Sequence, residues 1–346
     1  MQPDVRPIDI HRKIVELIDG GRPMAVALVL SASGSTPQRP GAKAAIDATG
    51  RIWGTVGGGA VEAEAQRVAV TACRSQCPVV FDFQMESDDA EALGAICGGT
   101  MRILVDPTAA KHRACYVAAA ETLERRERGA LLTTIRTDAE TSVQVEWVGE
   151  ADMAGRAIRW DESAAGYLEQ VADRRCEVFV ESIVPRPLLL IAGGGHVGQA
   201  LAVQAVQIGF DVTIVDDRPE FAGPGLFPRE ASVRCGSVAE QIAAHPMNKD
   251  TYVVIVTRGH RQDAEALTAC IRRRPAYLGM IGSRRKVALM RKNFLKNGLA
   301  TEEEWSRVHA PIGLSIGAVT VPEIAVSIAA QLIAVRRKVS HDPPTA

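Results

Sequence analysis

A glycine-rich segment in the second half of the chain has the spacing of a phosphate-binding loop. Residues 193–198 fit the pattern G-x-G-x-x-G, with His196 inside it and glycine at its three fixed places, Gly193, Gly195 and Gly198. The first glycine allows a tight turn, the second lets a pyrophosphate approach the backbone, and the third lets a helix pack against a strand. The pattern alone is a weak signal, because a glycine turn can also serve packing only.

The sequence on either side strengthens this prediction. The apolar run 188–192 precedes the glycines, a helical pattern follows them, and a second apolar run, 212–215, leads to Asp216. A carboxylate about 20 residues after the glycines is where Rossmann-type sites hold a ribose hydroxyl. We therefore predict binding of an adenine dinucleotide or a similar nucleotide. Asp216 disfavours a 2′-phosphate through like-charge repulsion, although the neighbouring Arg218 weakens that inference.

Two polar clusters follow later apolar runs in the same half of the chain. One comes after residues 252–256 and the other after residues 277–281. Because the carboxyl ends of parallel strands share one edge of a sheet, we expect both clusters to reach the same ligand. Ser283 is placed as a helix N-cap, and helix amides beside two arginines suit an anion, although a solvated helix face would look the same. The candidate residues are Thr257, His260, Gly282, Ser283, Arg284 and Arg285.

The first half of the chain offers two further polar loops. Residues 34–43 form a polar loop with two cations, which can wrap a phosphate or a polar heterocycle or simply connect two strands at the surface. Residues 54–62 place a glycine run before a helix, which gives a nest of backbone amides. The run is not a Walker A loop, because no Gly-Lys-Ser/Thr follows it. The ligand candidates are Ser35, Arg39, Lys43, Gly57, Gly58, Gly59 and Glu62, although the helix dipole alone could explain Glu62.

Cys97 is the candidate metal ligand. Two glycines follow it, so its sulfur can be open to a metal or to sulfur chemistry, although a buried inert cysteine is equally common. Cys73 and Cys77 alone are a poor zinc signal. Because the chain has no H-E-x-x-H, it gives no support to a metalloprotease.

The elements that must position these residues indicate an α/β protein of two domains. Pro185-Arg186-Pro187 suits a linker. Before it, residues 1–184 read as a mixed α/β domain, with strands near 25–30, 44–47, 101–105, 131–136 and 143–148 and helices near 8–19, 60–73 and 114–128. After it, residues 185–339 alternate strands and helices, which predicts a Rossmann-like doubly wound parallel sheet. Residues 340–346 read as a tail.

Composition limits the class of protein. The chain has 346 residues, of which 47% are hydrophobic and 23% charged, so two cores can form. With Lys+Arg at 40, Asp+Glu at 41 and aromatics at 4%, it has neither the basic field nor the stacking platforms of a nucleic-acid binder. Seven cysteines and a polar start predict a cytoplasmic protein. The apolar segment 324–335 is shorter than the roughly 20 residues of a membrane span.

Taken together, these motifs resemble the XdhC/CoxI family, accessory proteins in the maturation of molybdenum hydroxylases such as xanthine dehydrogenase. The likeness covers nearly the whole chain and rests on residues 34–37, 41–43, 54–62, 97–99, 193–198, 215–220, 256–260, 280–286 and 311–314. The chain departs from the family pattern at four places. Gln38 stands where arginine is usual, carboxylates are missing at Ser315 and Val319, and Pro322 replaces a third.

The resemblance implies a chaperone rather than an enzyme with conventional turnover. Such a protein binds molybdenum cofactor, protects it while a cysteine desulfurase supplies the sulfido ligand, and passes it to a molybdenum hydroxylase apo-enzyme. The cofactor's phosphate and polar pterin match glycine nests and arginines, and its molybdenum accepts a soft ligand such as the Cys97 thiolate. We also expect a homo-oligomer.

Two alternatives remain open from the residues. One is an NAD(P)-dependent oxidoreductase that uses the second domain for hydride transfer, with His260 as the only candidate proton donor. The other is a nucleotide-sensing regulatory protein, for which NAD(P) or another adenine nucleotide would be the ligand.

Overall fold

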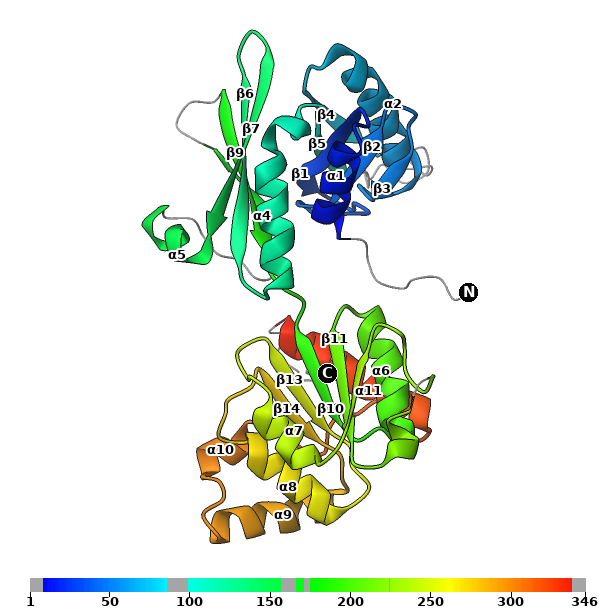
Figure 1. Ribbon diagram of the computed structural model, residues 1–346, viewed down its shortest axis with the longest axis vertical. Coiled ribbons are helices and arrows are strands. Elements are labelled where there is room, and N and C mark those ends of the chain that lie inside the picture. The colour runs from blue at the N-terminus through cyan, green and yellow to red at the C-terminus, as the bar shows by residue number, and fades with distance from the viewer. Residues whose placement is uncertain (1–8, 86–98, 157–165, 171–174, 224, 338–346) are drawn as a thin grey trace, which may run out of the picture. The chain divides into compact units, whose positions relative to one another are not determined.

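The computed structural model describes residues 9–85, 99–156, 166–170, 175–223 and 225–337. The chain divides into two compact units, one formed by Ile8–Pro185 and the other by the chain from Arg186 on (Figure 1). Each unit has its own sheets and core, and each is described separately below.

The C-terminal unit is built on a six-stranded sheet in the order β12-β11-β10-β13-β14-β15, with every neighbouring pair parallel. Numbered along the chain from β10, this is the order 3-2-1-4-5-6 of a Rossmann fold. The prediction of a doubly wound parallel sheet is therefore confirmed. The strands are β10 (Leu188–Ala192), β11 (Asp211–Asp216), β12 (Ser232–Cys235), β13 (Thr251–Ile255), β14 (Tyr277–Met280) and β15 (Val308–His309).

Helices cover both faces of this sheet (Figure 1). Leu190 and Val253 point to the face packed by α7, α8 and α9, whereas Leu189 and Val254 point to the face packed by α6 and α11. Because both faces are buried, the central strands read as continuous apolar runs. The helices are α6 (His196–Gln207), α7 (Val238–Ala244), α8 (His260–Cys270), α9 (Arg284–Lys296), α10 (Glu302–Ser306) and α11 (Val321–Arg336), with a short 3₁₀ turn, η3 (Pro219–Phe221).

The N-terminal unit contains two antiparallel sheets, ordered β3-β2-β1-β5-β4 and β7-β6-β9-β8. Helices α1 (Ile10–Asp19), α2 (Gly59–Ser75), α4 (Arg113–Glu124) and α5 (Glu150–Met153) accompany them, with 3₁₀ turns η1 (Ala109–His112) and η2 (Ala154–Arg156). The strands are β1 (Met24–Ser33), β2 (Lys43–Asp47), β3 (Ile52–Gly54), β4 (Val79–Gln84), β5 (Thr100–Asp106), β6 (Gly129–Thr137), β7 (Thr141–Gly149), β8 (Gly166–Gln170) and β9 (Cys176–Ile183).

The side chains of β1 point alternately into two hydrophobic cores, one on each face of the first sheet. Ala25 and Val29 pack with α2 on one face of the first sheet. Val26 packs on the other face with α1 and α4, in a cluster that also contains Leu131 of the second sheet. Helix α2 therefore lies on one side of the first sheet, and its N-terminus follows directly on the glycine run that the sequence singles out.

Candidate functional site

The glycine-rich loop joins β10 to α6, and its glycines have different roles. Gly193 has φ +118°, and a side chain there would lie 2.5 Å from the carbonyl oxygen of Val256. A side chain at Gly198 would collide with the carbonyl of Gly193, so this glycine brings α6 close to the strand. A side chain at Gly195 would meet no described atom within 4 Å. Packing thus requires Gly193 and Gly198, whereas Gly195 faces open space where a phosphate can approach.

Asp216, the predicted ribose acceptor, is bound by the chain itself. Its Oδ2 accepts from the Gly194 amide at 2.7 Å and from Arg218 Nη2 at 3.0 Å, and its Oδ1 accepts from Arg218 Nε at 2.9 Å. Burial would raise the pKa of this carboxyl, but the hydrogen bonds from Arg218 and Gly194 hold it below 3.8. In this structure Asp216 and Arg218 fasten the glycine loop to the end of β11 and do not present free groups to a ribose.

Two clusters that follow β13 and β14 meet through a buried carboxylate that sequence reasoning missed. Asp263, in the first turn of α8, is completely buried. Its Oδ1 accepts from Thr257 Oγ1 at 2.5 Å, and its Oδ2 accepts from Lys286 Nζ at 2.5 Å. Thr257 also adjoins the glycine loop, because a side chain at Gly193 would lie 3.0 Å from its amide nitrogen. Thr257 therefore contacts both Asp263 and the glycine loop, so these segments lie together at the carboxyl edge of the sheet, as predicted.

The exposed candidates of this unit lie at the N-termini of three helices. His196 and His260 are the first residues of α6 and α8, and both are exposed. Ser283 caps α9 by accepting from the amide of Lys286, as its position predicts. Arg284 and Arg285 follow it and are exposed, and Gly282 is half-buried before it. These groups offer amides and positive charge to an anion.

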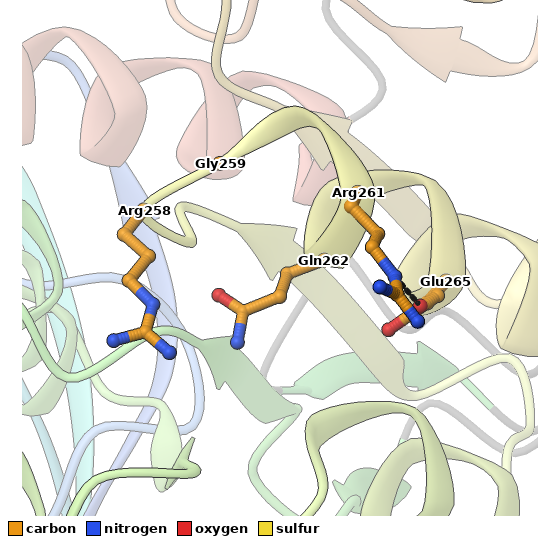
Figure 2. A pocket seen from close by; sticks show the side chains of 5 residues that line it. All are labelled: Arg258, Gly259, Arg261, Gln262 and Glu265. Atoms are coloured by element: carbon orange, nitrogen blue, oxygen red, sulfur yellow. Dashed lines mark hydrogen bonds and ion pairs between the residues drawn. The ribbon is translucent and has the colours of Figure 1, made fainter.

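A shallow pocket of about 400 Å³ opens at the start of α8, lined by Arg258, Gly259, Arg261, Gln262 and Glu265 (Figure 2). Arg258 and Gln262 both donate to Asp217 Oδ2, at 3.2 and 2.7 Å. Figure 2 shows Arg261 turned onto Glu265, with an Nε–Oε1 distance of 2.9 Å. Because carboxylates accompany both arginines, this pocket is less suited to an anion than the neighbouring start of α9.

In the N-terminal unit the loop 34–43, the glycine run and the start of β5 pack together. A side chain at Gly57, where φ is +141°, would lie 2.7 Å from Cγ of Pro37. A side chain at Gly99 would collide with the carbonyl of Ser35. Gly58 and Gly59, with φ of +71° and +55°, face open space at the N-terminus of α2. The three motifs thus form one glycine-lined surface.

Glu62 closes part of this surface. Its Oε2 accepts from Thr55 Oγ1 at 2.8 Å and from the amide of Gly58 at 3.0 Å. The carboxylate therefore holds the glycine run in place from the first turn of α2, which agrees with the structural explanation of Glu62. Ser35 and Arg39 are exposed on the facing loop.

Lys43 does not lie where the sequence pattern predicts it. Its side chain is 4% exposed, and its Nζ lies 2.5 Å from Oε2 of Glu181 on β9. The other oxygen of Glu181 lies 3.1 Å from His11 Nε2. Burial alone would raise the pKa of Glu181, but Lys43 and His11 lower it to about 2. The Lys43 side chain is therefore buried and paired inside the unit and is not presented to a ligand of the polar loop.

Cys97 lies outside the described residues. Among the described cysteines, Cys77 and Cys235 are exposed. Cys235 ends β12 opposite Asp216, and it is exposed because β12 is an edge strand. No cluster of three or more His, Cys, Asp or Glu in the described part is placed to hold a metal ion.

The strand order and the glycine loop define a two-unit α/β protein with a Rossmann-type second unit. Comparison with known families agrees: a model described as "XdhC Rossmann domain" matches residues 189–332, and one described as "XdhC and CoxI family" matches residues 17–84. The chain belongs to the XdhC and CoxI family. No helix in the described ranges is long and apolar enough to cross a membrane.

Two relatives are similar along nearly the whole chain, and a third is similar along part of it. It is 28% identical to uncharacterized protein YqeB of Escherichia coli (strain K12) over 95% of its length, and it spans only 46% of that protein. It is 22% identical to a probable xanthine dehydrogenase subunit of Bacillus subtilis (strain 168), with 96% and 99% of the two chains covered. Over 45% of the chain and 43% of the relative, it is 28% identical to the molybdenum cofactor insertion chaperone PaoD of Escherichia coli (strain K12).

A solved structure shows the same fold. The crystal structure of a xanthine dehydrogenase from Bacillus halodurans matches with a TM-score of 0.74 and 22% identity, over 96% of this chain and 98% of that chain.

Proposed function

We propose that this protein is an accessory chaperone that binds molybdenum cofactor and assists its sulfuration and its insertion into a molybdenum hydroxylase of the xanthine dehydrogenase type. The names of two relatives support this role, since one is a probable component of xanthine dehydrogenase and the other is a molybdenum cofactor insertion chaperone. The cofactor is cargo in this proposal, so conventional turnover is not expected.

The observation that carries the proposal is the convergence of three motifs in the N-terminal unit. Gly57 packs against Pro37, and Gly99 packs against Ser35. Gly58 and Gly59 remain open at the start of a 17-residue helix. The Gly58 amide already donates to Glu62, so the positive character of this surface comes from the N-terminus of α2 and from the neighbouring exposed Arg39. A polar heterocycle with an anionic group matches this surface.

The C-terminal unit by itself offers a second anion site. Its open groups are the Gly195 face of the glycine loop and the start of α9, with Ser283, Arg284 and Arg285. A phosphate is the part of the cofactor that these groups suit, because arginine and amide donors form charge-assisted hydrogen bonds with phosphate oxygens. We propose that this unit by itself can bind a phosphate group.

The proposed role also includes a source of sulfur, a recipient of the cofactor and an oligomeric state. A cysteine desulfurase would supply the sulfur, the apo-hydroxylase would receive the cofactor, and the chaperone would act as a homo-oligomer in the cytoplasm. Cys97 is the proposed soft ligand, because two glycines follow it.

Co-expression with an apo-hydroxylase in cells that make molybdenum cofactor tests the proposal. The wild type should carry molybdenum and pterin and should raise hydroxylase activity. Cys97→Ser should lower both, whereas Cys77→Ser, which changes an exposed cysteine, should change neither. Equal values for the two variants would refute the role of Cys97, and a wild type without molybdenum or pterin would refute the function.

A further inference from the structure

The place beside Asp216 where a Rossmann-type site holds the adenosine ribose is filled by the chain. Oδ1 of Asp216 accepts from the backbone amide of Arg218 at 3.0 Å and from its Nε at 2.9 Å. Oδ2 accepts from Arg218 Nη2 at 3.0 Å and from the Gly194 amide at 2.7 Å. A carboxylate has about four acceptor sites. All of them are used here, so none remains for a ribose hydroxyl.

Arg218 is fixed on a second side as well. Its guanidinium lies 3.8 Å from the centroid of the Phe221 ring, while its edge forms the bidentate pair with Asp216. The carboxylate of Asp216 is 3% exposed, and the side chain of Arg218 is 21% exposed. A planar guanidinium that is both stacked and bidentate is strongly held. A ligand must displace both contacts before it can reach Asp216.

The turn after β11 also covers the glycine loop. A side chain at Gly194 would collide with the carbonyl of Phe221 and would lie 3.3 Å from the ring of Phe227. Backbone atoms of η3 therefore occupy the side of the loop that faces β11. At Gly195 the loop is open, since an added side chain there meets no described atom within 4 Å. The loop thus has one closed side and one open side.

We infer that Asp216, Arg218 and Phe221 determine the specificity of the glycine loop: they exclude adenine dinucleotides and leave room for a ligand that ends in a single phosphate. This inference rests on the proposed function, because it takes the glycine loop as the site that binds the phosphate. A phosphomonoester needs only the open side at Gly195. A dinucleotide also needs the closed side for its adenosine half.

Calorimetric titration of the full chain with NAD⁺ tests this inference. The wild type should bind NAD⁺ no better than millimolar. Arg218→Ala frees the two acceptor sites of Asp216 that the guanidinium fills and removes the stacked ring contact, so it should tighten NAD⁺ binding by about tenfold or more, the value of one charge-assisted hydrogen bond. Arg218→Gln removes the charge and the bidentate pair but keeps part of the side chain, so it serves as a second variant if the alanine variant does not fold, and it should also tighten NAD⁺ binding.

Two further variants locate the effect. Gly195→Val in the Arg218→Ala background should abolish the gained binding, because the phosphates can no longer approach the loop. Arg291→Ala removes another exposed arginine, which pairs with Glu302, and should leave NAD⁺ binding at the wild-type level. Submillimolar NAD⁺ binding by the wild type would overturn the inference, and so would a folded Arg218 variant that gains nothing.

This experiment separates the inference from the proposed function. The titration needs no molybdenum, so a chain that carries no molybdenum or pterin but rejects NAD⁺ refutes only the chaperone role. A chain that carries the cofactor and also binds NAD⁺ refutes only the specificity of the loop.

Discussion

The Nζ of Lys43 and the Oε2 of Glu181, which are 138 residues apart in the chain, lie 2.5 Å from each other inside the N-terminal unit. The pair joins β2 of the first sheet to β9 of the second. His11 on α1 completes the group at 3.1 Å from Glu181. A charge network of this kind holds separate elements of the unit in one arrangement.

Replacing Lys43 by methionine should therefore destabilise the N-terminal unit. The change leaves Glu181 buried with only His11 beside it, and removing one partner of a buried ion pair costs about 3–5 kcal/mol. Denaturant unfolding of the full chain measures this loss. Arg39→Ala is the matched control, because it removes an exposed cation from the same loop and should change stability by less than about 0.5 kcal/mol. Equal stability of the two variants would contradict the buried role of Lys43.

Acid should weaken the same network. Burial opposes the shift, but Lys43 and His11 lower the pKa of Glu181 from 4.5 to about 2. A carboxyl with a lower pKa in the folded state stabilises the fold above its unfolded pKa, so this contribution is lost as the pH falls from 4.5 towards 2. The stability difference between wild type and Glu181→Gln should shrink over that range. A difference independent of pH would contradict the assignment.

Raising the pH should also weaken the Lys43–Glu181–His11 network, because His11 loses its proton. Burial lowers the pKa of His11, but the charge of Glu181 and the hydrogen bonds with Asp9 and Glu181 raise it above 6.5 overall. A histidine with a raised pKa stabilises the fold below 6.5 and loses that contribution as the pH rises through the raised value. The stability gap between wild type and His11→Gln should therefore narrow above neutral pH, and a gap that widens there would count against the ion pair.

Two glycines of the C-terminal loop should respond differently to valine. Gly198→Val should unfold the unit, because the added Cβ collides with the Gly193 carbonyl. Gly195→Val should fold normally, since the space in front of it is open, and should lose phosphate binding. Thermal unfolding and phosphate titration separate the two effects. Retained phosphate binding in folded Gly195→Val would show that the anion binds elsewhere.

Arg284 and Arg285 should matter for binding and not for stability. Both are exposed at the start of α9, so replacing both by alanine should leave unfolding unchanged. Each charge-assisted contact is worth roughly 1.5–3 kcal/mol, so the double variant should bind the phosphate ligand at least about tenfold more weakly and with less dependence on salt. Unchanged affinity would make these residues a solvated helix face.

The local parts of the fold are readable in the sequence. Apolar periodicity predicts the strand and the helix within residues 188–207. The glycine loop between them and the cap at Ser283 follow from residue types that favour turns and helix N-termini. The parallel sheet follows because strands buried on both faces lose the alternation of polar and apolar residues.

The long-range parts are not readable in this way. Local patterns assign Lys43 to its loop, because its partner Glu181 is distant in the sequence and only folding reveals the pair. Asp216 reads as a ribose acceptor because its spacing from the glycines is right, but the spacing does not show that Arg218 already fills its acceptors. Asp263 reads as an ordinary first-turn acid of a helix until Thr257 and Lys286 are seen beside it.

The central claim, that the chain binds molybdenum cofactor, is tested most directly by the metal and pterin content of the purified protein. The wild type should be isolated from cells that make the cofactor and assayed by metal analysis and by pterin fluorescence after oxidation. We predict molybdenum and pterin in equal amounts, both lost from cells that cannot make the cofactor. A protein that carries neither, and that turns over a nicotinamide nucleotide instead, would contradict the account.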